Sequence, residues 1–556
     1  MQGQYRGDFT RDTFAPLKHF SRVLIQQGRV QVDADLNEQI AILLRYLQTL
    51  AADLIGRHGG PADHWGFAIA PAGLRDRDFR IGPGHYYVDG ILCEVDATPV
   101  SAIVQQANTK QVQVSAAMVD GVVFQPGQYV EVFSAAQPPN AANPILTKIT
   151  AVDQVLRTLT LDTDVQVFQA AAAVPRIRRV ATYLTQPDYP VPAAEQLRQG
   201  THQVYLDVWE RHLTYVEDDG IREVALGGPD TAARAKVVWQ VRVMEAAGAT
   251  ALSRDRPCLS VDELRAAQQP DNRGRLKAMA KQDTPSTDPC VVSPSARYRG
   301  PENQLYRVEI HRAGDAWDGK TAKISAATFK WSRENGSVVF PISKMATDSA
   351  AGTTTLTLEN LGKDDRLTLS VGDWVEIQDD DSVLQNRADK LLQVHSIDRM
   401  SMTVILSGIP GSSVGQVPAK HPLLRRWEQT EGDPTEGGLQ LGDDGAALII
   451  EDGGDNWLGL EDGVQIQFQP ADSDQPANHY RTGDYWLIPA RTATGDVEWP
   501  TALDSQGKPM ALAVKPHGVE HHYAPLAVIS LDASGTVKLA HDCRLKFDGL
   551  AKPLRR

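Results

Sequence analysis

Beyond residue 60 the sequence is a succession of short runs rich in Val, Ile, Thr and aromatic residues, separated by Gly, Pro, Asn and Asp. Several runs alternate apolar and polar residues with the period of two that turns one face of a strand toward a core. Strands that follow one another without long intervening helices favour antiparallel sheets. The sequence therefore predicts a mainly β protein, built of several antiparallel β-sandwich or small-barrel modules. The runs behind this prediction include 86–93, 203–209, 236–243, 305–310, 327–331 and 464–468.

One N-terminal amphipathic helix is predicted before this region, over residues 36–55. Its apolar side chains recur at steps of three and four, which forms a continuous stripe along one helical face. Asp35 is expected to cap the helix, with Glu38 three residues later, and Gly56 to end it. Such a stripe is typical of a helix that docks on another surface. The candidate interface residues are Leu36, Ile40, Leu43 and Leu47.

A sequence pattern occurs twice in the β region. The run Gly127-Gln-Tyr-Val-Glu-Val132 has a counterpart in Gly372-Asp-Trp-Val-Glu-Ile377. Asp153 follows the glutamate of the first run by 22 positions, and Asp398 follows that of the second run by the same 22. Each copy is preceded by a further strand-like run. We interpret the pattern as two copies of a small barrel-like module; chance similarity of strand and turn composition is the alternative.

These patterns divide the chain into eight regions. The proline-rich stretch 251–295 is predicted to be a linker or excursion, in which Ser260 and Glu263 could cap one short helix. The full series is an N-terminal docking segment with the helix (1–60), a β-hairpin region (61–110), the first barrel-like module (111–170), β-strands (171–250), the linker (251–295), β-strands (296–352), the second barrel-like module (353–410) and a C-terminal β region (411–556).

The charge balance disfavours two classes of partner. The chain has 56 Lys and Arg against 70 Asp and Glu, a net charge of −14. Nucleic acids and anionic membranes attract clustered positive charge, so neither is an expected partner. No apolar run approaches the ~18 residues of a membrane span. The N-terminus lacks the apolar segment of a secretory signal, so we expect synthesis in the cytoplasm without a signal peptide.

The four cysteines, Cys93, Cys258, Cys290 and Cys543, lie far apart and include no C-x-x-C pair. Their spacing matches neither a zinc site nor a disulfide framework. Free Cys is among the most buried residue types. We therefore expect buried free thiols in a reducing compartment.

Two groups of residues are weak candidates for metal binding. His517, His521 and His522 include the letters of the H-x-x-E-H zinc motif, but Pro516 and Gly518 disfavour the helix that this motif needs. Asp379, Asp380 and Asp381 could supply oxygens to Ca²⁺, which takes six to eight ligands, although the run matches no EF-hand loop. No cofactor is expected, and a structural Ca²⁺ remains an alternative.

No group of residues supports a catalytic assignment. The run Gly411-Ser-Ser-Val-Gly415 has the letters of a nucleophile elbow, but the following prolines disfavour the helix that an elbow requires. The ten tryptophans could stack on sugars if exposed, and abundant carboxylates could include a glycosidase pair. Burial of the tryptophans in strands is the favoured reading, so an enzymatic role is open but not favoured.

Several blocks of the sequence resemble an uncharacterised bacterial family that contains a domain of unknown function. The opening block is Gly7-Asp-Phe-Thr-Arg-Asp-Thr-Phe14, and later blocks include Tyr205-Leu-Asp-Val-Trp-Glu-Arg211 and Phe329-Lys-Trp-Ser-Arg-Glu-Asn-Gly-Ser-Val338. Further similar blocks are 30–39, 223–230 and 302–309, so the resemblance covers most of the chain. The family offers no catalytic or binding residues to carry over. The hairpin-like run 82–91 is similar to hairpins of phage baseplate and tail-fibre proteins.

Members of this family occur beside phage-tail-like contractile injection systems. The resemblance therefore implies a structural or adaptor component of such a particle, acting through protein–protein interfaces. Its expected partners are protein components of the particle and further copies of the same chain, since such parts are usually homo-oligomers. Release from the cell would then occur as part of the assembled particle. The alternative is a polysaccharide-acting enzyme or a glycan-binding cargo or tip protein.

Overall fold

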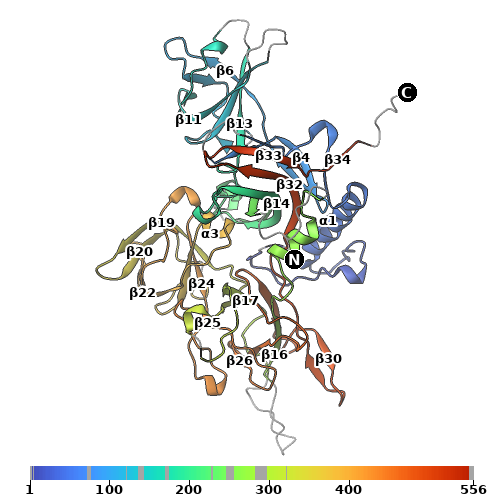
Figure 1. Ribbon diagram of the computed structural model, residues 1–556. Coiled ribbons are helices and arrows are strands. Elements are labelled where there is room, and N and C mark those ends of the chain that lie inside the picture. Colours follow the sequence, from blue (N-terminus) through green and yellow to red (C-terminus); the bar gives the residue numbers. More distant parts are fainter. Residues whose placement is uncertain are drawn as a thin grey trace, which may run out of the picture. The chain divides into compact units, whose positions relative to one another are not determined.

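The computed structural model describes residues 3, 5–71, 77–119, 122–135, 143–169, 174–226, 230–245, 256–281, 297–320, 322–362 and 364–549 (Figure 1). The chain divides into two compact units. The first unit contains residues 1–45, 209–237 and 270–520, and the second contains 46–208, 238–269 and 521–556. The described strands form antiparallel sheets and two closed barrels, which confirms the predicted mainly β fold class.

The second unit contains a six-stranded barrel in the order β10-β11-β12-β7-β6-β13, which closes because β10 also pairs with β13. Its interior is filled by small and medium apolar side chains such as Val112, Val130 and Leu159. The barrel strands are β6 (Val100–Val104), β7 (Gln111–Val114), β10 (Tyr129–Ser134), β11 (Ile145–Asp153), β12 (Thr158–Leu161) and β13 (Pro175–Thr182), and β3 (Phe79–Ile81) and β2 (Ile69–Pro71) extend the sheet.

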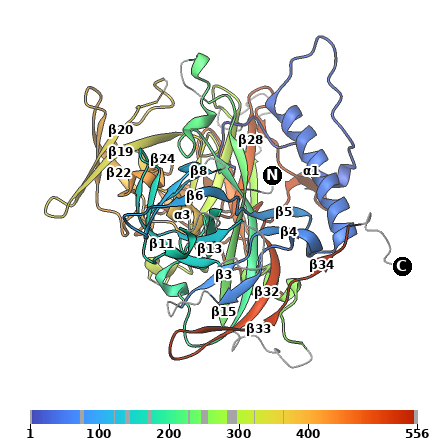
Figure 2. The ribbon, with the colours of Figure 1, turned by 90° about the horizontal axis from the view of Figure 1, so that it is seen from above.

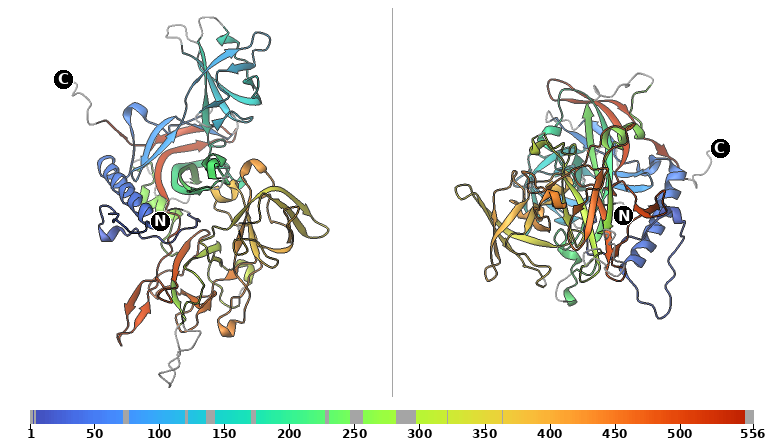
Figure 3. Two further views of the ribbon diagram at one scale, coloured as in Figure 1. Left: turned by 180° about the vertical axis from the view of Figure 1, so that it is seen from behind. Right: turned by 90° about the horizontal axis from the view of Figure 1, so that it is seen from below.

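The first unit contains a second closed barrel with the same connectivity. Its order is β21-β22-β23-β20-β19-β24, so each strand occupies the place of one strand in the first barrel. Glu131 in β10 and Glu376 in β21 hold equivalent positions. The strands are β19 (Val339–Asp348), β20 (Thr353–Leu358), β21 (Trp374–Gln378), β22 (Leu392–Asp398), β23 (Thr403–Ser407) and β24 (Leu423–Trp427). The β19–β20 hairpin extends well beyond the barrel wall (Figure 3).

Each barrel takes strands from outside the expected ranges 111–170 and 353–410. In the second unit β6 and β13 complete the ring, and in the first unit β19 and β24 do so. The pattern that repeats in the sequence corresponds to the glycine turn and strands β10 to β12 in one barrel and β21 to β23 in the other. The closing strands differ in length between the two barrels and lie outside the pattern that repeats in the sequence.

The rest of the first unit is a two-layer β structure with a large aromatic core. One layer has the order β25-β18-β17-β28-β29 and the other β16-β27-β26. Phe329, Trp331, Phe468 and Trp486 fill the space between them. The strands are β16 (Arg275–Ala280), β17 (Gln304–Arg312), β18 (Thr328–Ser332), β25 (Ala447–Leu448), β26 (Leu458–Gly459), β27 (Val464–Gln469), β28 (Tyr485–Arg491) and β29 (Asp496–Val497), with a separate hairpin β30 (Thr501–Leu503) and β31 (Pro509–Ala511).

Two four-stranded sheets have the orders β15-β14-β32-β33 and β34-β1-β4-β5. The turn between β4 and β5 is Asp89-Gly90, both with positive φ, as a tight hairpin requires. The strands are β14 (Gly200–Leu213), β15 (Arg234–Glu245), β32 (His522–Leu531), β33 (Val537–Asp542), β1 (His58–Pro61), β4 (Gly84–Val88), β5 (Ile91–Val95) and β34 (Lys546–Phe547), and β8 (Met118–Val119) pairs with β9 (Val122–Val123).

Three α-helices occur in the described residues: α1 (Asp33–Ile55), α2 (Val261–Gln268) and α3 (Asp380–Leu384). The predicted cap of α2 is confirmed, since Ser260 and Glu263 form a reciprocal capping box. The predicted cap of α1 is wrong. Asp33 accepts hydrogen bonds from the backbone and hydroxyl of Thr10 and begins the helix, so Asp35 lies in its first turn. None of these helices combines the length and apolar composition that crossing a membrane requires.

The prediction that all cysteines are free thiols is wrong. Cys258, just before α2, and Cys543, just after β33, form a disulfide within the second unit. The two residues are 285 positions apart, and only the fold brings β33 to the segment that precedes α2. Cys93 is a buried free thiol, as expected. Cys290 lies outside the described residues.

Candidate functional sites

The apolar stripe of α1 is exposed to solvent. Leu36, Ile40, Leu43 and Leu47, the candidate interface residues, are between 48% and 66% exposed. Leu50 and Leu54 continue the stripe at similar exposure. We call these six side chains the α1 seam. A large apolar surface of this kind on a folded protein marks a binding surface.

The opposite side of α1 is the less exposed one. Ala34 and Ile42 are its buried residues. The segment before the helix runs back alongside it (Figure 2), where Glu38 accepts a hydrogen bond from Thr13 and Gln39 accepts one from the backbone of Val23. That segment adds further apolar side chains that are more than half exposed, namely Leu17, Phe20, Leu24, Ile25 and Val30. The helix therefore presents its most apolar face outward.

The three aspartates considered for Ca²⁺ contact hydrogen-bond donors and cations of the first unit. Asp379 precedes α3 and accepts hydrogen bonds from the backbone N–H groups of Ser382 and Gly415. Asp380 contacts Arg211 at 2.7 Å and His421 at 2.8 Å. Asp381 pairs with Lys420. Burial alone would raise the pKa of Asp380, but its hydrogen bonds and the charge of Arg211 lower it.

The three candidate histidines lie in different surroundings. His517 is packed against Tyr485, and burial lowers its pKa to about 4. His521 Nδ1 lies 2.6 Å from Asp207, and His522 Nδ1 lies 2.9 Å from Asp89. Within the described ranges no group of three or more His, Cys, Asp or Glu side chains is arranged to hold a metal ion.

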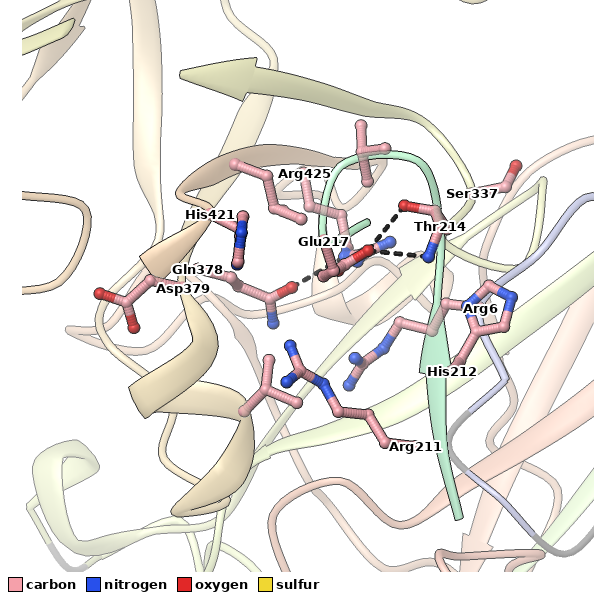
Figure 4. Close-up of a pocket in the computed structure, with 13 residues that line it drawn as sticks. Arg6, Arg211, His212, Thr214, Glu217, Ser337, Gln378, Asp379, His421 and Arg425 are labelled. Atoms are coloured by element: carbon pink, nitrogen blue, oxygen red, sulfur yellow. Dashed lines mark hydrogen bonds between the residues drawn. The ribbon is translucent and has the colours of Figure 1, made fainter. Parts of the chain in front are cut away.

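A pocket in the first unit is lined by several cations (Figure 4). Arg6 enters from the N-terminal segment, Arg211 and His212 from the end of β14, and Arg425 from β24. The arginine side chains are each more than nine-tenths buried. Burial and the charges of neighbouring arginines, Arg425 first among them, lower the pKa of His212 to about 3. We call this site the arginine pocket.

Next to the arginine pocket lies a buried ionic network. The carboxylate of Glu309 in β17 accepts hydrogen bonds from Nε and Nη2 of Arg6, at 2.9 and 2.7 Å. It also accepts one from Nε of Arg307, at 2.6 Å. Lys330 in β18 lies 2.6 Å from Glu376 in β21. Burial alone would raise the pKa of Glu309, but the charges of these cations lower it well below its ordinary value.

This network explains several of the sequence blocks that resemble the family. Arg307 and Glu309 belong to the block 302–309, and Lys330 to the block 329–338. Asn335 of the latter block donates a hydrogen bond to the carbonyl of Gly7 in the opening block, at 2.9 Å. The blocks thus hold the N-terminal segment on the first unit. Sequence reasoning missed both the network and the arginine pocket.

The tryptophans do not form an exposed platform. Five of the ten are buried: Trp209, Trp239, Trp331, Trp427 and Trp486. The other five, Trp65, Trp317, Trp374, Trp457 and Trp499, are partly buried. The indole N–H of Trp427 also donates a hydrogen bond to Glu376 at 3.0 Å, so this tryptophan is part of the ionic network.

The chain matches a family of unknown function, DUF6519, over residues 5–123, 183–257 and 248–553. No curated protein and no solved structure matches it. The matched ranges include α1, most strands of both units and the residues of the arginine pocket. Since they span most of the sequence, the chain belongs to the family DUF6519.

Proposed function

We propose that this protein is a structural or adaptor subunit that acts through a protein–protein interface centred on the α1 seam, within a phage-tail-like contractile injection particle. The observation that carries the proposal is the outward-facing apolar stripe of α1. Leaving six large aliphatic side chains half to two-thirds exposed is unfavourable in water, and a partner surface would remove that cost.

The spacing of the seam indicates what kind of surface covers it. The six residues from Leu36 to Leu54 are separated alternately by four and three positions. That alternation is the seam of a coiled coil, in which each apolar side chain fits between side chains of a facing helix. The partner surface is therefore another helix with a matching stripe.

A second copy of this chain supplies such a helix. The positions that flank the seam are Asn37, Gln39, Leu44, Tyr46, Ala51 and Asp53, and only Asp53 is charged. Two copies therefore meet without like-charge repulsion along the seam.

The particle context is supported by the sequence blocks and not by the geometry of the seam. The blocks 7–14, 205–211 and 329–338 resemble proteins that occur beside such injection systems. Two of these blocks also contact each other, since Asn335 donates a hydrogen bond to the carbonyl of Gly7, which is in keeping with a subunit whose work is assembly.

The test has two arms. In the first arm, sedimentation velocity of the full chain is measured from about 0.1 to 100 µM, and we expect a concentration-dependent dimer. A monomer over the whole range overturns self-association through α1. In the second arm, tail-like particles are purified from the native bacterium and searched for the chain by mass spectrometry. Its absence from particles that retain sheath and tube overturns the particle context alone.

A further inference from the structure

One buried cation at the arginine pocket makes no ion pair with any described residue. Glu309 and Glu376 lie among the buried cations Arg6, Arg307, Lys330 and Arg425, while Arg211 is paired with Asp380. Arg6, Arg307 and Lys330 contact these carboxylates directly. The fourth cation, Arg425, has no carboxylate of the described residues within ion-pairing distance. Burying a cation without a counter-ion is costly, so its position calls for an explanation.

In the barrel of the second unit, the counterpart of Arg425 is Arg178. Glu131 in β10 faces Arg178 in β13 across the strand pair, and the two form an ion pair with Nε to Oε2 at 2.8 Å. At the equivalent place in the first unit, Glu376 in β21 faces Arg425 in β24. One barrel therefore keeps the cross-strand ion pair, and the other does not.

Glu376 is engaged elsewhere. Its Oε2 atom accepts hydrogen bonds from Lys330 at 2.6 Å and from the indole of Trp427 at 3.0 Å. Arg425 instead donates to two neutral acceptors, Oε1 of Gln378 at 2.9 Å and the carbonyl oxygen of Gly336. Burial and the nearby charge of Arg6 lower the pKa of Arg425 to about 9.

Two further residues that line the pocket have buried nitrogen atoms with no hydrogen-bond partner among the described residues. Within the described part of the chain, Nε of Arg211 and Nε2 of His212 are buried without a hydrogen-bond partner. The two carboxylates that line the pocket are already engaged. Glu217 accepts the backbone N–H and the hydroxyl of Thr214, both at 2.8 Å, and Asp379 accepts two backbone N–H groups.

We propose that the arginine pocket binds a small oxyanion group, a carboxylate or a phosphate, with Arg425 and Arg211 as its cationic ligands. The planar guanidinium matches both groups through paired hydrogen bonds. The cavity volume of about 30 Å³ accommodates one such group and no large organic ligand. Figure 4 shows Arg6, Arg211 and Arg425 reaching the pocket from different segments. The bound anion supplies Arg425 with the counter-ion that Arg178 finds in Glu131. This inference does not depend on the proposed assembly function.

The test is isothermal titration of the full chain with sodium phosphate and with sodium acetate, each against sodium chloride at equal ionic strength. We expect saturable binding of one of the two probes beyond the chloride response. Saturation by phosphate alone assigns a phosphate site, and saturation by acetate alone or by both assigns a carboxylate-tolerant site. The absence of saturable binding of either probe overturns the proposal.

Two variants and a control locate the site. Arg425→Gln removes the unmatched cation and should weaken binding at least about tenfold, as loss of a charged hydrogen-bond partner does. Gln378→Glu places a carboxylate beside Arg425; it should abolish binding and raise the melting temperature, because the protein then carries its own counter-ion. Arg399→Gln, at an exposed position of the same barrel, should change neither. Wild-type affinity in either pocket variant overturns the proposal, and Gln378→Glu decides the matter if Arg425→Gln does not fold.

Discussion

Replacing Leu43 and Leu47 together by alanine should break the proposed α1 pair while leaving each subunit folded. A leucine-to-alanine change removes about three carbon groups, worth about 2.4 kcal/mol when fully buried, at ~0.8 kcal/mol for each group. Leu43 is 48% exposed and Leu47 is 63% exposed, so about half of that value remains for a partner to supply. Each leucine therefore contributes about 1.3 kcal/mol to the interface.

Both leucines occur twice in a two-fold pair, so the double substitution should weaken association by about 5 kcal/mol. That loss raises the dissociation constant by between three and four powers of ten. The free energy of unfolding of the separated subunit should fall by only about 2 kcal/mol, the share of the deleted atoms that is already buried within it, and the higher helix propensity of alanine offsets part of that loss.

The assay is sedimentation velocity over a concentration series, with circular dichroism and the melting temperature as controls for folding. The matched control is Arg45→Ala with Thr49→Ala, two exposed positions about half a turn away from the seam. It should associate like the wild type. An equal dissociation constant for the seam variant and the control would refute the reasoning. So would a seam variant with a strongly lowered melting temperature, since its leucines would then be packed within the subunit.

Three further predictions concern the stability of each unit. Replacing Cys258 and Cys543 by serine should lower the free energy of unfolding by about 3–5 kcal/mol in urea titrations, because the disulfide restricts a very long loop of the unfolded chain; reduction of the denatured wild type should release two additional thiols. Ser260→Ala should cost about 1 kcal/mol through loss of the α2 cap, seen as faster amide exchange in α2, whereas unchanged exchange would mean that the cap is dispensable. The pKa of His212 is lowered to about 3, below its ordinary 6.5, so the unfolded chain binds the proton first and stability is lost as the pH falls from 6.5 toward 3. Between pH 6.5 and 5 the wild type should lose about 2 kcal/mol more than His212→Gln, and parallel curves for the two proteins would contradict this.

Features encoded by neighbouring residues could be predicted from the sequence, and features that join distant segments could not. The strand class follows from local alternation, and the α2 cap follows from Ser260 and Glu263 within one turn. The double occurrence of the β pattern is also local, with Glu131 and Glu376 each at the same distance from a following aspartate. These signals need only a few consecutive residues to be recognised.

The arginine pocket has no such signal. Arg6, Arg211 and Arg425 are separated by about two hundred positions each, and only the meeting of the N-terminal segment, β14 and β24 makes them neighbours. The disulfide was missed for the same reason. The exposure of the α1 seam could not be predicted from the sequence either, because the same periodic stripe of apolar residues occurs in helices that pack on a core and in helices that bind a partner. One partial signal existed, since Arg178 and Arg425 each lie in the strand that closes their barrel.

The interleaved composition of the two units has a consequence for how the chain is made. The part of β14 from Gly200 to Val208 pairs with β32, which begins only at His522. At a synthesis rate of about 5–20 residues per second, β14 emerges from the ribosome roughly 15 to 60 s before its partner exists. During that interval an apolar strand edge is unprotected, and such edges recruit other chains. Neither unit can be completed before residue 520 has been made, so the barrels, whose strands are contiguous in the sequence, can fold earlier than the sheet that contains β14 and β32.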